Sequence, residues 1–76
     1  MARIDISKME KMEKTRNTVH DEVVATYDVF TYNGIQYLQI DTYGRSDREY
    51  VEKSSQIIQL DKESALNLVK LINKIF

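Results

Sequence analysis

The chain has 76 residues, with 11 lysine and arginine residues against 12 aspartate and glutamate residues, a net charge of −1 and no cysteine. This length predicts a single small domain with a marginal core, and the balanced charge argues against binding of nucleic acid through bulk positive charge. The lack of cysteine excludes disulfides and thiolate–metal sites, and we expect neither a metal nor a cofactor. No stretch has the apolar length of a secretory signal or a membrane span, which predicts a cytoplasmic protein.

Residues 1–17 differ from the rest of the chain and form an N-terminal arm, for which the sequence allows a strand, a helix or a flexible segment. Ile4 and Ile6 alternate with polar residues, as in a short strand. Ser7 and Glu10 have the spacing of a capping box, which would start a helical turn. A docked helix and a frayed terminus are therefore both open, and residues 18–76 make up the folded domain.

Three strands are predicted in this domain. Residues 18–32 are rich in valine, threonine and aromatic residues, which strands prefer. Asn33-Gly34 follows, a dipeptide typical of the type I′ turn of a tight hairpin, because both central residues need a positive φ. Apolar and polar residues then alternate from Ile35 to Tyr43 and, after a polar connection, from Ser54 to Leu60.

A helix is predicted after the last strand. Asp61 is a good N-cap, and the segment that follows contains no glycine or proline. The fold class is therefore α+β: an antiparallel β-meander of three to four strands followed by one C-terminal helix. The apolar stripe of this helix is wider than one small sheet needs, so we expect the protein to dimerise through the helix. The predicted interface residues are Leu68, Leu71, Ile72, Ile75 and Phe76.

Groups typical of catalysis are scarce in this sequence. His20 is the single histidine, and glycine occurs only at positions 34 and 44, which excludes a glycine-rich phosphate loop. The carboxylates between the predicted strands are too irregularly spaced for a calcium loop. We therefore do not expect an enzyme.

One face of the predicted sheet carries tyrosines beside polar residues, and a single helix does not cover both faces of a sheet. Aromatic rings on an open sheet provide a stacking platform for unpaired bases, and basic residues of the polar connection would meet the phosphates. The same pattern also fits an ordinary hydrated sheet face beside a solvated connection. The candidate nucleic-acid-binding residues are Tyr32, Tyr37, Tyr43, Arg45, Arg48 and Lys53.

Two stretches, "YNGIQYLQIDTY" and "SQIIQLDKESALNLVKLI", give the chain a family resemblance. From Tyr27 to about Ile72 it resembles the single-stranded DNA-binding domain of the positive cofactor four family of transcriptional coactivators and their bacterial relatives. The resemblance implies a homodimer formed through the helices, which binds single-stranded DNA or RNA as a transcription or replication accessory factor. Tyr32 matches an aromatic position that the family uses for stacking, and the connection with Arg45, Arg48 and Lys53 matches its polar, often basic loop.

The chain also departs from the family pattern, because Asp41 stands where a basic residue is expected and Gly44 near an expected aromatic residue. Two other functions therefore stay open. One is a small protein-binding inhibitor or adaptor, of phage or mobile-element type, that acts on a host nucleic-acid enzyme and whose acidic side chains imitate phosphates. The other is a structural or regulatory oligomer. The charge of the open sheet face discriminates between binding of nucleic acid, which needs basic side chains there, and binding of a partner protein, which acidic side chains would favour. The acidic residues in question are Asp41, Asp47, Glu49 and Glu52.

Overall fold

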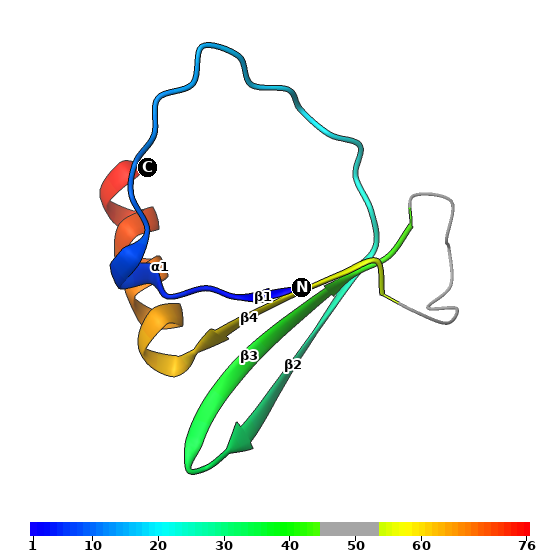
Figure 1. The fold of residues 1–76 in the computed structure, drawn as a ribbon, viewed down its shortest axis with the longest axis vertical. Helices are drawn as coiled ribbons and strands as arrows, with labels where there is room; N and C mark the ends of the chain where they lie inside the picture. The colour runs from blue at the N-terminus through cyan, green and yellow to red at the C-terminus, as the bar shows by residue number, and fades with distance from the viewer. Residues whose placement is uncertain (45–53) are drawn as a thin grey trace.

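The structure, a computed structural model, describes residues 1–44 and 54–76 and has one sheet followed directly by one helix (Figure 1). The sheet has the strand order β1-β4-β3-β2, with an antiparallel meander from β2 to β4 and with β1 parallel to β4. This confirms the α+β prediction of a meander with a C-terminal helix. The elements are β1 (Ala2–Arg3), the 3₁₀ turn η1 (Ile6–Lys8), β2 (Ala25–Tyr32), β3 (Ile35–Thr42), β4 (Gln56–Asp61) and α1 (Lys62–Ile75).

The predicted hairpin turn is confirmed by its backbone angles. Asn33 has a φ of 51° and Gly34 a φ of 78°, so both central residues adopt the positive φ that a type I′ turn requires. Tyr32 and Ile35 face each other directly beside the turn, and this pairing sets the register of the whole hairpin.

All three predicted strands have different bounds in the structure, and the second differs only in ending at Thr42 instead of Tyr43. The first starts at Ala25 and not at residue 18. The strand β3 ends opposite Ala25, at Thr42, and beyond it the Tyr43 N–H donates one further backbone hydrogen bond to the Val24 carbonyl oxygen at 3.0 Å. The third starts at Gln56 and not at Ser54, and it includes Asp61. Alternation alone does not show where a neighbouring strand ends, so strand ends are poorly defined by sequence.

The N-terminal arm combines a short strand with a turn. Arg3 pairs with Gln59 in the parallel ladder, and the Ile4 N–H donates to the Gln59 carbonyl oxygen at 2.9 Å. Asp5, and not Ser7, caps η1, and its carboxylate accepts a hydrogen bond from the Ser7 N–H at 3.0 Å. The predicted capping box of Ser7 and Glu10 is therefore wrong, because Ser7 lies inside the turn and no helix follows it.

The turn η1 is joined to the helix. Asp61 is the N-cap of α1, as predicted, and its carboxylate accepts a hydrogen bond from the Ser64 N–H at 2.7 Å. The Ser64 hydroxyl, which is buried, in turn accepts a hydrogen bond from the Ile6 N–H at 3.2 Å. Past this junction the arm runs along α1 and returns to β2 as a long exposed connection with no helix or strand (Figure 1).

The helix α1 packs against β3 and β4, on the sheet face that carries Leu38 and Leu60. The cover is incomplete: among the described residues the only buried hydrophobic side chains are Leu60, on this face, and Tyr37, on the opposite face. The polar side chain of Ser64 is also buried. In residues 1–44 and 54–76 no helix has the length and apolarity to cross a membrane.

Much apolar surface stays exposed on the covered side of the sheet. The exposed apolar residues on this side are Tyr27 and Val29 of β2, Leu66, Val69, Ile72 and Ile75 of α1, and Phe76 directly after the helix. The accessible surface of the whole chain, which includes the long exposed connection before β2, is 7246 Å², whereas a compact monomer of this mass exposes about 4800 Å². The radius of gyration of 14.5 Å, to which the same connection contributes, exceeds the roughly 11 Å of a compact domain of this length.

Candidate nucleic-acid interface

The sheet face opposite α1 collects polar and aromatic side chains from all four strands. Cross-strand pairing places Arg3, Gln59, Gln39 and Asp28 in one row across β1, β4, β3 and β2. The next row towards the hairpin turn contains Tyr37 opposite Phe30, and Tyr32 follows beside the turn. We refer to the surface formed by these seven residues as the aromatic face.

Tyr37 is the centre of the aromatic face. The Phe30 ring stacks on it with a centroid distance of 5.4 Å and an interplanar angle of 20°. On Arg3, the guanidinium carbon lies 5.8 Å from the centroid of the Tyr37 ring, and NH1 donates a hydrogen bond of 3.3 Å to the Tyr37 hydroxyl. Phe30 and Arg3 thus account for the burial of Tyr37, which is 8% exposed.

A hollow of about 240 Å³ opens beside this cluster and is lined by Arg3, Phe30, Tyr32, Tyr37 and Gln59. We call it the aromatic hollow. Tyr32 is 63% exposed, so its ring is accessible to a planar ligand, whereas the Tyr37 ring lies beneath its neighbours. A cation, exposed aromatic area and an amide therefore meet at one place on the surface, which are the groups that bind an unpaired base by stacking and hydrogen bonding.

Of the three predicted binding residues that the structure describes, Tyr32 and Tyr37 come together in the aromatic hollow and Tyr43 does not. Tyr32 and Tyr37 both line it. Tyr43 follows the opposite end of β3, where its hydroxyl shares a 3.1 Å hydrogen bond with the Thr26 hydroxyl. The predicted residues Arg45, Arg48 and Lys53 lie outside the described residues.

Sequence reasoning missed three residues of the aromatic hollow, namely Arg3, Phe30 and Gln59. Phe30 had a usable signal, because it lies two positions from Tyr32 and so shares its face. Gln59 had a similar signal, because it lies between Ile58 and Leu60 and alternation therefore places it on the face opposite these two apolar residues. Arg3 had none, because a strand of two residues has no periodicity and its parallel pairing with β4 is a long-range contact.

A chain of side-chain hydrogen bonds crosses the centre of the aromatic face. Gln59 Nε2 donates to Gln39 Oε1 at 2.8 Å, and Gln39 Nε2 donates to Asp41 Oδ1 at 2.8 Å. All three residues are half-buried. Hydrogen bonds of this length in a partly dry setting hold the two amides in a defined orientation.

The charges on this side of the sheet are mixed, with an acidic excess among the described residues. Among the residues that the structure describes, Arg3 is the cation on this side, and Asp28, Asp41 and Asp61 are carboxylates on the same side. Asp28 accepts a hydrogen bond from the Val29 N–H at 2.8 Å, and Asp61 caps α1. Two of the carboxylates thus each accept a backbone hydrogen bond and keep their negative charge.

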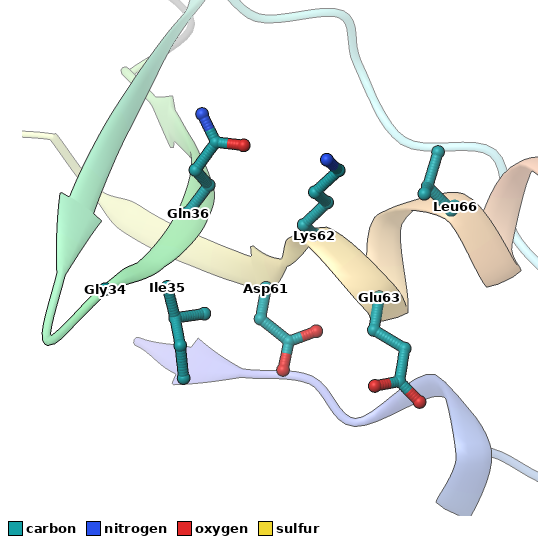
Figure 2. A pocket seen from close by; sticks show the side chains of 7 residues that line it. All are labelled: Gly34, Ile35, Gln36, Asp61, Lys62, Glu63 and Leu66. Atoms are coloured by element: carbon teal, nitrogen blue, oxygen red, sulfur yellow. The ribbon is translucent and has the colours of Figure 1, made fainter.

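A larger hollow of about 560 Å³ lies between the hairpin turn and the first turn of α1. Figure 2 shows that Ile35, Asp61 and Glu63 extend to one side of it and Gln36, Lys62 and Leu66 to the other, with Gly34 at the rim. The polar groups do not converge on a common point, and Asp61 is occupied as a helix cap. This open notch therefore has no arrangement suited to catalysis or to a specific ligand.

The part of the chain that the structure describes contains no group of three histidine, cysteine or carboxylate side chains that could hold a metal ion. His20 lies in the exposed connection before β2. The side chains that line the aromatic hollow carry aromatic rings, an amide and a guanidinium.

Comparisons with known proteins returned no match: no protein-family model, no curated protein and no solved structure matches this chain.

Proposed function

We propose that the protein is a small homodimer that binds single-stranded nucleic acid on its aromatic face. The observation that carries the proposal is the aromatic hollow, where exposed aromatic area and the Arg3 guanidinium lie together on a sheet face that no helix covers. In a duplex the faces of the bases are stacked on one another, whereas a single strand exposes them to the rings of the protein. The sequence resemblance to the positive cofactor four family suggests the same ligand class and an accessory role in transcription or replication.

In the proposed complex a base stacks on Tyr32, and Phe30 and Tyr37 support the site from below. The Phe30–Tyr37 pair is rigid because the Arg3 guanidinium and the sheet hold the Tyr37 ring on both sides. Such preorganisation lowers the entropy lost on binding. Stacking contributes about 1–3 kcal/mol per base.

Phosphate contacts are expected to be few. Among the residues that the structure describes, Arg3 is the cation beside the aromatic hollow. The phosphate contacts predicted for Arg45, Arg48 and Lys53 stay predictions. For single strands the logarithm of the affinity falls with the logarithm of the salt concentration with a slope of about 0.7 for each phosphate contact. A shallow salt dependence is therefore the expected signature of this site.

The proposed second copy covers the exposed apolar surface of α1 and β2. Seven large apolar side chains of β2, α1 and the C-terminal residue, Tyr27, Val29, Leu66, Val69, Ile72, Ile75 and Phe76, are each at least 43% exposed. Monomeric proteins rarely expose a contiguous apolar surface of more than a few hundred Å². Of the predicted interface residues, Ile72, Ile75 and Phe76 are exposed, whereas Leu68 and Leu71 are half-buried within the chain.

A second function, binding of a partner protein, is favoured by one specific observation. Three described carboxylates lie on the open side of the sheet with one described cation, Arg3. An acidic sheet face suits a basic protein surface better than a phosphate backbone. In that case the protein would act as an inhibitor or adaptor of a nucleic-acid enzyme.

Fluorescence anisotropy with labelled single-stranded and double-stranded oligonucleotides of equal length, at two salt concentrations, separates the two functions. The proposal requires tighter binding of the single strand and a shallow salt slope. If the single strand does not bind and a basic partner protein does, the second function is favoured. Equal binding of single and double strands would contradict a role for base stacking.

A further inference from the structure

One side of α1 carries apolar residues with a symmetric spacing. Ala65, Val69, Ile72 and Phe76 follow one another at intervals of four, three and four residues, which places them on one side of a helix. The helical geometry extends to Phe76, whose N–H donates to the Ile72 carbonyl oxygen at 3.0 Å. We call these four residues the helix seam. Its spacing is the same when it is read from either end.

The helix seam is largely uncovered in a single copy of the chain. Val69 is 54% exposed, Ile72 43% and Phe76 99%. Apolar residues at this spacing form the contact line between two packed helices. In an antiparallel pair of α1 about a two-fold axis, Val69 lies opposite Ile72 of the second copy. In the same register, Ala65 lies opposite Phe76 of the second copy.

The surface beside Ala65 is hollowed. This hollow has a volume of about 270 Å³ and lies between α1 and the sheet face that the helix covers. A cavity of about 150 Å³ with apolar walls is large enough for a benzene ring. The small Ala65 side chain thus leaves room for an aromatic ring, and we call this space the Ala65 hollow. It is lined by Val29, Gln36, Tyr37, Leu38, Lys62 and Ala65.

Phe76 cannot fill the Ala65 hollow of its own chain, because the helix between the two residues is about 16 Å long. We propose that α1 pairs antiparallel with α1 of a second copy, and that Phe76 of each copy fills the Ala65 hollow of the other. The inference rests on the proposed homodimer and adds the register of its interface. A parallel pair would place Phe76 against Phe76 and Ala65 against Ala65, which crowds one end of the interface and leaves both hollows empty.

Sedimentation equilibrium tests the contact of Phe76. Phe76→Ala should raise the dissociation constant of the dimer by about a hundredfold or more, since two equivalent rings are lost and each contributes at least about tenfold. The fold of the monomer is preserved, because Phe76 is 99% exposed in a single copy. Lys74→Ala is the control, since Lys74 lies in the last turn but on the side of α1 opposite the helix seam. It should change the dissociation constant by no more than about twofold.

An exchange of the large and the small residue tests whether Phe76 and Ala65 meet. Ala65→Phe fills the hollow with a ring of its own chain, so it should weaken the dimer as Phe76→Ala does. The double variant Ala65→Phe with Phe76→Ala again places one ring opposite one small side chain. It should therefore dimerise more tightly than either single variant, because two residues in contact have non-additive effects.

The direction of the helix pair is measured with spin labels on single introduced cysteines, since the chain contains no cysteine of its own. Glu63→Cys and Lys74→Cys place the label on the same side of α1, away from the helix seam. In the proposed pair the two-fold axis lies midway between Lys70 and Leu71. The two copies of position 63 are then about 22 Å apart along the helix axis, and those of position 74 about 10 Å. The distance between labels should therefore be longer at position 63.

The failure of the register and the failure of the dimer give different results. If the wild type is a dimer but Phe76→Ala dimerises as tightly, or if the two label distances are equal, the register is wrong and the proposed dimer stands. If the wild type sediments as a monomer, the dimer and its register fail together. Binding of single strands is measured separately by anisotropy.

Discussion

Arg3 NH1 donates a hydrogen bond of 3.3 Å to the Tyr37 hydroxyl, although the two residues are 34 positions apart in the chain. The contact fixes both partners: the guanidinium is held near the ring, and the ring is held between Arg3 and Phe30. Arg3 comes from β1, an edge strand of two residues, whereas Tyr37 lies in β3 inside the sheet. The aromatic hollow therefore depends on a contact between the smallest element of the fold and one of its central strands.

Tyr32 is the residue whose ring is most accessible in the aromatic hollow, so Tyr32→Ala should weaken binding of a single strand by about 1–3 kcal/mol. The loss should be equal at all salt concentrations, because stacking involves no phosphate charge. Anisotropy titrations at two salt concentrations measure it. Thr31→Ala is the control, since Thr31 is exposed on the opposite face of the same strand and is not part of the proposed apolar interface. An equal loss in both variants would remove the special role of the aromatic face.

Arg3 is tested by two substitutions that separate charge from shape. Arg3→Gln should reduce the salt slope by about 0.7 if the guanidinium meets one phosphate. Arg3→Lys keeps the charge and should keep the slope, but it loses the planar group that lies over Tyr37 and should bind more weakly at every salt concentration. A slope unaffected by Arg3→Gln would show that Arg3 acts through Tyr37 alone.

Ile72→Glu should convert the proposed dimer into a monomer. Ile72 is 43% exposed on α1, so the monomer accommodates a carboxylate there, whereas an apolar interface does not. Sedimentation equilibrium at micromolar concentration measures the change. Asn73→Glu introduces the same charge at the neighbouring exposed position and should leave the dimer intact. A wild type that sediments as a stable monomer would contradict the proposal.

Asp5 gives a prediction on pH. The Ser7 hydroxyl donates to the Asp5 carboxylate at 2.6 Å, and this bond, together with the Ser7 N–H, lowers the pKa of Asp5 from its ordinary value of 3.8. Because the folded-state pKa lies below the unfolded value, the stabilisation of η1 is present above pH 3.8 and is lost as the pH falls through the folded pKa. An NMR titration should place the Asp5 pKa below 3.8, and Ser7→Ala should raise it.

The local features of the fold could be predicted from short stretches of sequence. Asn33-Gly34 specifies its turn because few other dipeptides tolerate two positive φ angles, and Asp61 marks the helix start because its side chain satisfies a free N–H. Strand alternation assigned the two sheet faces correctly around Tyr37 and Leu38. Each of these features depends on residues that are near one another in the chain.

The candidate site was harder to predict because it depends on pairings between distant segments. Tyr32 was recognised by its place beside the turn, but nothing near Arg3 in the sequence indicates that it pairs beside Gln59. The alternation of Tyr37 with Leu38 did not indicate that Tyr37 would be buried on the open face, since that burial comes from Phe30 and Arg3. Asp41 appeared as a departure from a basic pattern, whereas in the structure it orients Gln39.

The parallel pairing of β1 with β4 has a consequence for the order in which the molecule assembles during synthesis. The strand β1 leaves the ribosome before β4, and more than 50 residues separate the two strands in the chain. The β2–β3 hairpin closes over a two-residue turn and can form early, whereas the closure of the β1–β4 loop carries a larger entropic cost. We therefore expect nascent chains to acquire the hairpin before the Arg3–Tyr37 contact, so that competence to bind a ligand is the final step of maturation.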